Sequence, residues 1–555
     1  MVIDPGFGPR TIHDLCATLA SEDSGKLAVE GPGLRCSRSE LQRRVEAMAA
    51  GLGKAGLVRG DRVAIWMPNG IQWIALLLAA SRLGLTLVAL NMRYKTDEVG
   101  YILKHSRAVM LIMAPQSGKT DYLAMLRGLV PEIERPGELA SASFADLRHV
   151  VLSSPAPDLP HLRTLADLES QADDVLPPQA SQPNDALLVL YTSGTTSAPK
   201  GVMVRESSLT ANAEYLNAWM QLRADDRILL LSPFCGIYGV NALIGALLAG
   251  ATVIVSDTTD AEATLDLAER EKVTALGGTL DAIIRPWTEI QSRRPRDLSL
   301  LRSRIVPVAW MQGDPLIEMP AAEAALGVRL VHTYGLSEGT AMSLLGDPQE
   351  TPEHRHGGRL RPISPQVEVK VAPVADADAQ AEPGVGELCL RGPLIMAGYL
   401  DDPAATRAAI DDEGWLHTGD FARMYPDGSV RYEGRIKDMV KISGYSVSPA
   451  EIEHFLSSHP DIAEVQVVGV PGGKSSDMIA AFVIAKRGAQ VDRDSIAAFC
   501  EGRIATFKIP AIVRVVEEFP IAPSANADKV QKKFLRDLLV RERDGAPSEN
   551  TGRKA

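Results

Sequence analysis

Two long apolar stretches repeat one order of elements along the chain. Residues 71–90 are predominantly apolar and are interrupted by Arg82 and Gly84, and residues 240–255 are predominantly apolar around Gly250. The run before each glycine has the length of a buried helix, and the run after it resembles a buried strand. The interruptions in the first stretch argue against a membrane span. Buried helices alternating with buried strands predict stacked α/β layers with mostly parallel sheets.

The pattern changes after about residue 367, where short strand-like runs alternate with turn signals. The sequences E-P-G-V-G at 382–386 and P-D-G-S at 426–429 are typical of hairpin turns. Earlier in the chain, residues 154–185 are rich in Pro, Asp and Ser and predict a surface connection ahead of a strand over 186–191.

A compact mixed unit is predicted after residue 434. The sequence S-P-A-E at 448–451 is typical of a helix start and predicts a helix over 449–457. Strands are predicted over 465–470 and 479–484. We therefore expect three parts, namely an N-terminal domain over 1–434, a small α+β domain over 435–540 and a flexible tail over 541–555.

Composition narrows the function. A chain of 555 residues is too long for one ordinary core, and its 45% hydrophobic and 23% charged residues are typical of globular proteins. The net charge of −12 argues against nucleic-acid binding. Five scattered cysteines without a C-x-x-C pair predict neither a zinc site nor a disulfide framework. The N-terminus lacks a signal-peptide pattern, so we expect a cytoplasmic protein.

The strongest chemical signal is L-Y-T-S-G-T-T-S-A-P-K-G at 190–201, where an apolar strand enters a loop of small residues that ends in a lysine. Glycine and hydroxyl residues can direct several donors at one anion, and Lys200 adds a point charge for phosphate. Pro199 excludes a Walker A loop. A Ser/Thr-rich surface turn is the weaker alternative. The candidate phosphate-binding residues are Thr192, Ser193, Gly194, Thr195, Thr196 and Lys200.

This loop resembles that of the adenylate-forming superfamily, which includes acyl-CoA synthetases, luciferases and peptide-synthetase adenylation domains. The family loop reads Y-T-S-G-T-T-G-x-P-K-G, and the chain departs from it at Ser197. A second signature, Y-G-L-S-E at 334–338, matches the family's Y-G-x-[ST]-E. The resemblance implies that Glu338 binds Mg²⁺, Ser337 contacts the α-phosphate, Tyr334 lies near adenine and Gly335 lets backbone approach the nucleotide.

Two further motifs, W-L-H-T-G-D at 415–420 and Y-E-G-R-I-K-D at 432–438, match the family in order and spacing. A carboxylate suits a vicinal diol because it accepts two hydrogen bonds. The resemblance implies that Asp420 holds the ribose and that Arg435 lies near ribose and phosphate. Taken alone, Asp420 could be a turn residue and Arg435 a surface ion-pair partner. Tyr432 and Asp314 complete the implied nucleotide contacts.

The resemblance also assigns residues to the second half of the reaction. The segment K-I-S-G-Y at 441–445 matches the family's pantetheine tunnel, which implies roles for Lys441, Ser443, Gly444 and Tyr445. Lys437 takes the hinge position. Lys529 is the expected catalytic lysine because V-Q-K follows it, although Asp528 replaces the family's glycine. Lys532 and Lys533 are the alternative lysines, and their simpler interpretation is as solvated helix residues. The segment G-E-L-C-L-R-G-P at 386–393 is interpreted as a structural strand.

The implied fold is a large domain with a distorted barrel subdomain and a small mobile C-terminal domain. The implied activity is formation of acyl-AMP and then acyl-CoA, with ATP, Mg²⁺ and CoA as ligands and Lys529, Glu338 and Lys200 as catalytic residues. A carboxylic acid is the expected partner, contact with nucleic acid or an integral membrane segment is not expected, and a homodimer is left open. A luciferase-like enzyme, a carrier-loading protein and a non-catalytic acyl-adenylate binder are the alternatives.

The sequence constrains the identity of the carboxylic acid substrate less than it constrains the nucleotide site. The family's P-L-F-H-x-x-G segment is P-F-C-G-I-Y-G at 233–239, so Gly236 replaces the histidine that edges the acyl pocket. No acidic residue lies between 232 and 245, which disfavours an amino-acid substrate. A roomy pocket for a medium-chain, alicyclic or aromatic acid is one interpretation, and glycines that only allow a turn are the other. The candidate pocket residues are Gly236, Tyr238, Gly239 and Trp310.

Overall fold

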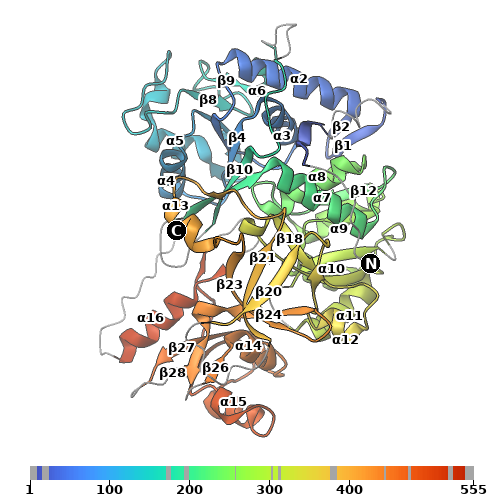
Figure 1. Ribbon diagram of the computed structural model, residues 1–555, viewed down its shortest axis with the longest axis vertical. Coiled ribbons are helices and arrows are strands. Elements are labelled where there is room, and N and C mark those ends of the chain that lie inside the picture. Colours follow the sequence, from blue (N-terminus) through green and yellow to red (C-terminus); the bar gives the residue numbers. More distant parts are fainter. Residues whose placement is uncertain are drawn as a thin grey trace.

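The structure is a computed structural model, and it describes residues 9–14, 24–170, 177–192, 199–256, 258–301, 304–310, 314–374, 384–442, 445–472, 477–522 and 529–543. These residues form a large N-terminal part and a smaller C-terminal part below it (Figure 1). Among them, no helix is long and apolar enough to cross a membrane.

The first layer of the large part is an eight-stranded sheet in the order β22-β11-β10-β4-β3-β5-β8-β9. All neighbours from β10 to β9 pair in parallel, and β11 is antiparallel to both of its neighbours. The strands are β3 (Arg62–Trp66), β4 (Thr86–Ala89), β5 (Met110–Met113), β8 (His149–Leu152), β9 (Arg163–Thr164), β10 (Ala186–Thr192), β11 (Lys200–Arg205) and β22 (Gly398–Tyr399).

Two five-stranded sheets complete the layers, in the orders β14-β12-β13-β1-β2 and β15-β16-β17-β18-β19. Their strands are β1 (Leu27–Gly31), β2 (Leu34–Ser37), β12 (Arg227–Leu230), β13 (Thr252–Val255), β14 (Ala275–Gly277), β15 (Thr279–Leu280), β16 (Ile305–Ala309), β17 (Arg329–Leu336), β18 (Ala341–Leu345) and β19 (Arg361–Pro362). A small hairpin of β6 (Gln116–Ser117) and β7 (Thr120–Asp121) lies outside them.

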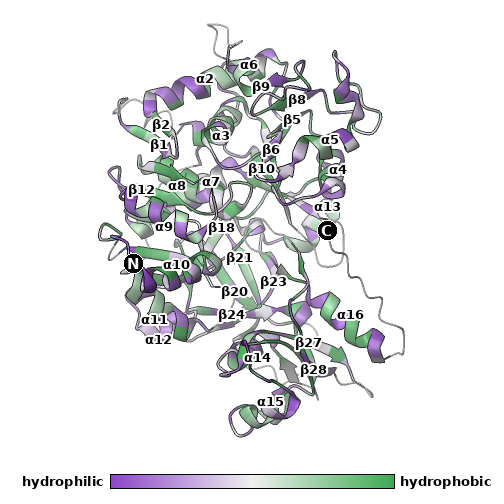
Figure 2. Ribbon diagram, turned by 180° about the vertical axis from the view of Figure 1, so that it is seen from behind, coloured by the Kyte–Doolittle hydropathy of each residue, from purple (hydrophilic) through white to green (hydrophobic). Residues whose placement is uncertain are grey.

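Helices cover these sheets. They are α2 (Arg38–Lys54), α3 (Ile71–Leu83), α4 (Thr96–Ser106), α5 (Tyr122–Leu129), α6 (Leu165–Ser170), α7 (Glu206–Met220), α8 (Ile237–Leu248), α9 (Ala261–Arg270), α10 (Asp281–Arg293), α11 (Pro315–Leu326), α12 (Pro352–His356) and α13 (Pro403–Ala409). The largest hydrophobic cluster contains residues of α2, α3 and α8, of the eight-stranded sheet and of the five-stranded sheet that includes β1. Figure 2 shows the hydrophobic colouring of inner elements such as α8 and polar segments along the outer helix α2.

Both predicted helix–glycine–strand units are confirmed. Helix α3 ends at Gly84, whose φ of +68° is left-handed, and β4 follows at once. Helix α8 and β13 flank Gly250, whose φ is +66°. Glycine adopts this conformation without the penalty that a Cβ brings, so each helix can stop and reverse into a buried strand.

The four-stranded antiparallel sheet β20-β21-β23-β24 takes the place predicted for the barrel subdomain. A bridge between Leu360 and Val430 links it to the strand region around β19. The strands are β20 (Glu368–Ala372), β21 (Val385–Arg391), β23 (Leu416–Met424) and β24 (Val430–Arg435). The predicted turn at 426–429 joins β23 and β24, with the Tyr425 N–H donating to the Ser429 carbonyl.

The C-terminal part follows the short helix η3 (Ile436–Asp438). The helix predicted over 449–457 is α14, which has these bounds and is capped by Ser448, and the predicted strands lie within β27 and β28. The elements are β25 (Val440–Ile442), β26 (Tyr445–Val447), α14 (Pro449–Ser457), β27 (Ile462–Pro471), β28 (Asp477–Ala485), α15 (Arg493–Cys500), β29 (Ile512–Val515), β30 (Ile521–Ala522), β31 (Lys529–Val530) and α16 (Lys532–Arg543).

The predicted fold class, α/β with a large layered domain and a small C-terminal domain, is therefore confirmed. Two local expectations differ from the structure. The polar connection over 154–185 contains helix α6, because Leu165 and Leu168 reach the main core. Helix α16 continues to Arg543, so the first residues of the predicted tail are helical.

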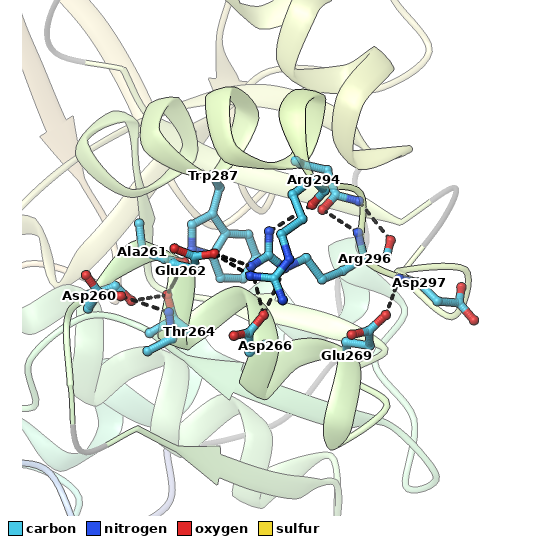
Figure 3. A network of polar contacts seen from close by, with 12 residues as sticks. Asp260, Ala261, Glu262, Thr264, Asp266, Glu269, Trp287, Arg294, Arg296 and Asp297 are labelled. Atoms are coloured by element: carbon cyan, nitrogen blue, oxygen red, sulfur yellow. Dashed lines mark hydrogen bonds and ion pairs between the residues drawn. The ribbon is translucent and has the colours of Figure 1, made fainter.

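A buried arginine ties α9 to the segment after α10 (Figure 3). The Arg296 side chain is 3% exposed, and it donates to Asp266 at 2.9 Å and to Glu262 at 3.0 Å. The Gln291 amide donates to the Arg296 carbonyl at 2.8 Å. Because this buried cation is paired with carboxylates of the same region, its role is structural.

Candidate active site

A bulge in strand β23 creates the centre of the site. Its pairing with β21 passes from Glu387 opposite Phe421 to Cys389 opposite His417, so residues 418–420 face Leu388 alone. Gly419 has a left-handed φ of +69° within this bulge. Bulges re-aim side chains at the edge of a regular ladder. Here the bulge carries the T-G-D motif and directs Asp420 away from the normal strand register.

Three hydrogen bonds hold the bulge. The Thr418 hydroxyl donates to the Leu388 carbonyl at 2.6 Å, and the Asp420 N–H donates to the Thr418 hydroxyl at 3.1 Å. The Gly419 N–H donates to Glu387 Oε1 at 3.0 Å. The threonine and glycine of this motif therefore have a local structural reason, which is to fix the position of the aspartate.

The Asp420 carboxylate is 2% exposed and meets two functional groups from distant motifs. The Tyr334 hydroxyl donates to Oδ2 at 2.5 Å, and Arg435 Nε lies 3.0 Å from Oδ1. Burial, and then the Asp420 charge, raise the pKa of Tyr334 well above its usual value. Arg435 also donates to the Thr418 carbonyl at 3.2 Å. The structure thus brings together three residues that the sequence assigned to one site.

One side of this group is open. The Tyr432 ring lies 5.9 Å from the Tyr334 ring between centroids, at an interplanar angle of 34°. Tyr432 and the Arg435 side chain are each 41% exposed. An exposed aromatic ring near a buried carboxylate and an arginine suits a base and a sugar diol, because rings stack and carboxylates accept two hydrogen bonds.

A second polar group contains Glu338 and Lys200. Glu338 lies with Ser337 in the short helix η2 (Ser337–Gly339), directly after β17. The Tyr399 hydroxyl donates to Glu338 Oε1 at 2.9 Å, and the Lys200 ammonium lies 4.8 Å from the centroid of the Tyr399 ring. Burial, and then Glu338, raise the pKa of Tyr399. The Glu338 carboxylate and the Lys200 ammonium therefore both lie close to the Tyr399 side chain.

Sequence reasoning missed Tyr399. It lies in β22, which pairs with β11 at Val202, and this long-range pairing carries the tyrosine to Lys200. A single tyrosine after glycine has no distinctive spacing, so only the pairing could have identified it. The Gly335 prediction acquires a different physical reason, because a Cβ there would collide with the Ala341 carbonyl of the neighbouring strand.

Several predicted residues lie outside the described residues. They are Ser193, Gly194, Thr195 and Thr196 of the phosphate loop and Ser443 and Gly444 of the CoA segment. Thr192 ends β10 and pairs with Lys200 across the loop. The backbone of Lys441 lies in β25 and that of Tyr445 in β26, and these strands pair antiparallel.

The lysine candidates near the C-terminus differ in their surroundings. The backbone of Lys529 pairs with Ala522 in the β30–β31 hairpin. Lys532 forms an ion pair with Glu453 at 2.7 Å, and both side chains are largely buried. A lysine already paired in this way suits a structural role, and the catalytic role of Lys529 stays a prediction.

The predicted hinge lies where the large part ends. Arg435 is the last residue of β24, and Lys437 lies in η3 immediately after it. Burial lowers the pKa of Lys437. Close to this junction, the Ser448 hydroxyl donates to the Glu433 carbonyl and fastens the start of α14 to β24. The hinge role of Lys437 stays a prediction.

Asp314 lies at the junction of the two parts. Its carboxylate accepts the Leu316 N–H at 2.8 Å as the N-cap of α11, and it lies 3.7 Å from His454 Nε2 on α14. This geometry gives Asp314 a capping role and a contact with the small part. Its nucleotide-binding role stays a prediction.

Three of the candidate acyl-pocket residues lie at the start of α8. Gly236 is the N-cap of this helix, and Tyr238 is buried in one hydrophobic cluster, whereas Trp310 packs against a different one. A Cβ on Gly239 would collide with the Pro233 carbonyl, so this glycine is needed to seat the helix. The packing of Gly239 inside α8 gives it a reason that neither interpretation named, and the pocket role of Gly236 stays a prediction.

Comparisons with known proteins match both parts of the chain. The model of the AMP-binding enzyme family matches residues 17–400, and that of the AMP-binding enzyme C-terminal domain matches residues 451–526. A methyl-dioxo-octahydroindenyl propanoyl:CoA ligase of Mycobacterium tuberculosis is 34% identical, covering 95% of this chain and 99% of that protein. The mitochondrial medium-chain acyl-CoA ligase ACSF2 of Homo sapiens is 30% identical, covering 93% and 85%.

Solved structures share the fold. The anthranilate CoA ligase AuaEII, in complex with anthranoyl-AMP, matches with a TM-score of 0.83 at 22% identity, covering 96% of this chain and 98% of that one. ATP-bound MatB from Rhodopseudomonas palustris matches with a TM-score of 0.81 at 24% identity, covering 95% and 99%.

Proposed function

This chain belongs to the AMP-binding enzyme family and is an ATP-dependent acyl-CoA synthetase, and we propose that the group around Asp420 holds the AMP half of its nucleotide. The observation that carries the proposal is the buried Asp420 carboxylate, fixed by Tyr334 and Arg435 close to the exposed Tyr432 ring. In this assignment Asp420 accepts the ribose hydroxyls, and the rings of Tyr334 and Tyr432 border the base.

The first step brings two anions together. An oxygen of the acid attacks the α-phosphorus, the new P–O bond forms, and the bond to pyrophosphate breaks. Lys200 and Arg435 supply positive charge near the phosphates, which matters most in the crowded transition state. Mg²⁺, when bound, neutralises phosphate charge, and the hard carboxylate oxygens of Glu338 suit it. The loop over 193–196 adds donors in this proposal.

The second step replaces AMP by CoA. The CoA thiol loses its proton and attacks the acyl carbon, the thioester bond forms, and AMP leaves with the electron pair of the broken acyl–oxygen bond. We assign Lys529 to the first step and the segment around Lys441 and Tyr445 to the CoA tunnel. Rotation of the small domain about Lys437 would exchange them, since a residue at the end of an element can absorb a large backbone change.

We propose that the substrate is a medium-chain, alicyclic or aromatic acid. The named relatives include one ligase for an alicyclic propanoate and one for medium-chain acids. The missing acidic residue between 232 and 245 argues against an amino acid. A non-catalytic or carrier-loading role remains the alternative. A cytoplasmic location and a homodimer also stay proposals, and light scattering tests the homodimer.

Pyrophosphate release tests the function directly. The full chain is incubated with ATP, Mg²⁺ and a panel of short, medium-chain, alicyclic and aromatic acids, with and without CoA. We expect release with the larger acids and thioester only when CoA is present. Gly236→His should shift the preference toward smaller acids by about 10-fold or more, as steric changes in acyl pockets do. Pyrophosphate release without thioester from any acid would favour the alternative role.

A further inference from the structure

Three potential metal ligands of different chemistry meet beneath the bulge. Cys389 of β21 and His417 of β23 are direct cross-strand partners, and Glu387 lies two residues before Cys389, on the same side of its strand. Their ligand atoms all lie within 4.8 Å of one another. We propose that Glu387, Cys389 and His417 form a Zn²⁺ site.

The distances suit tetrahedral zinc. Cys389 Sγ lies 3.6 Å from His417 Nδ1, and zinc–sulfur and zinc–nitrogen bonds at a tetrahedral angle place such atoms about 3.5 Å apart. His417 Nδ1 lies 2.8 Å from Glu387 Oε2. These two atoms share a proton in the metal-free chain and must open by about 0.5 Å around an ion. Thiolate, imidazole and carboxylate are the ligand types that zinc uses.

A fourth residue orients the histidine. Asp411 Oδ2 lies 3.3 Å from His417 Nε2, while Asp411 Oδ1 accepts the Trp415 N–H at 2.8 Å. A carboxylate on the far nitrogen orients the ring, as in carboxylate–histidine–zinc arrangements, so that Nδ1 faces Glu387 and Cys389. The second contact holds Asp411 itself in place, so the imidazole is presented to Cys389 and Glu387 in one orientation.

Access and charge are also favourable. The His417 side chain is 33% exposed and that of Glu387 is 20% exposed, so an ion can enter from solvent while Cys389 stays buried. The positive charge of Lys370 repels a cation, but the negative charges of Glu387 and Asp411 outnumber that positive charge.

The site is coupled to the nucleotide. Glu387 Oε1 accepts the Gly419 N–H, and Gly419 precedes Asp420 in the bulge. Moving the Glu387 carboxylate toward an ion weakens this contact and loosens the residue that places Asp420. Zinc should therefore raise the apparent KM for ATP. The site has no C-x-x-C signal in the sequence, because its ligands come from two strands that only the fold brings together.

Zinc binding by the full chain tests the inference, using Zn²⁺ alone in competition with a chromophoric chelator. The wild type should bind one equivalent, and Cys389→Ser and His417→Gln should weaken binding by about 100-fold or more. Asp411→Asn, which removes the orienting contact and one nearby negative charge, should weaken it by about 10–100-fold. Cys500→Ser changes another buried cysteine and should bind as the wild type.

Co²⁺ provides an independent readout, because a thiolate ligand gives a charge-transfer band that a serine cannot. We expect the band in the wild type and in Cys500→Ser and its loss in Cys389→Ser. Each variant is first shown to have wild-type circular dichroism in chelator. Equal zinc affinity in the wild type and Cys389→Ser, or a cobalt complex without the thiolate band, would overturn the site. Neither result touches acyl-CoA formation, so the proposed function is tested separately.

Discussion

Two buried carboxylates in the large domain have opposite surroundings. Glu206 is 1% exposed and accepts hydrogen bonds from the Ile12 N–H and the Ser81 hydroxyl, while nearby Asp14 and Asp185 add negative charge. Asp420 is 2% exposed and faces an arginine and a phenol. Burial raises the pKa of Glu206 to about 7.

The difference separates a structural carboxylate from a functional one. Glu206 accepts hydrogen bonds from neutral groups and ties the N-terminal segment to α7, while burial and two nearby carboxylates disfavour its charged form. Asp420 has a cation beside it and lies close to the exposed Tyr432 ring, so its carboxylate is next to a place that a ligand can reach. Burial alone therefore does not identify a binding residue, whereas the partners do.

The largest effect is expected from Lys529, which the proposed mechanism uses at the Asp420 site in the first step. Lys529→Ala should slow adenylation by about 100-fold or more, because its charge offsets repulsion between carboxylate and phosphate. Conversion of supplied acyl-adenylate and CoA to thioester should stay near normal. Separate assays of the two half-reactions provide the measurement.

Two matched variants separate the roles of the neighbouring lysines. Lys532→Ala removes a lysine already paired with Glu453 and should leave adenylation near the wild-type rate. Lys437→Pro should spare adenylation and abolish thioester formation, because proline restricts the hinge φ and removes its N–H. Equal impairment of both halves by Lys529→Ala would mean that the lysine is structural or that the domain does not rotate.

Glu206 should make the stability of the large domain depend on pH. Its folded pKa, about 7, lies above its ordinary value of 4.5, so its stabilising contribution is complete below about pH 4.5 and is lost as pH rises through about 7. The loss is about 1.4 kcal/mol per pH unit within this window. Glu206→Gln should remove this component when denaturant unfolding is compared with the wild type across pH. An unchanged pH profile would contradict the assignment.

A smaller effect is expected from Arg435→Lys. Lysine keeps the charge beside Asp420 but loses the planar donor set that also reaches the Thr418 carbonyl. We expect the KM for ATP to rise by about 10-fold, with unfolding free energy changed by less than about 1 kcal/mol. Steady-state kinetics at varied ATP measure this, and a wild-type KM would show that the guanidinium geometry is dispensable.

Much of the fold could be predicted because its signals are local. Helix α14 has the predicted bounds since its cap, proline and glutamate lie within four residues. The bulge at 418–420 could not be predicted, because it depends on which residues of β21 face β23. Gly239 shows the same limit, since its motif position suggested pocket space and its contact with Pro233 explains it by packing.

Asp420 is the central residue of the proposed mechanism, and ATP affinity measured by calorimetry tests its role most directly. Asp420→Ala should weaken ATP binding by about 1.5–3 kcal/mol, the range for a charge-assisted hydrogen bond, while Glu206→Gln should bind ATP as the wild type does. Wild-type affinity in Asp420→Ala, with its fold confirmed by circular dichroism, would contradict the assignment of Asp420 as a nucleotide ligand.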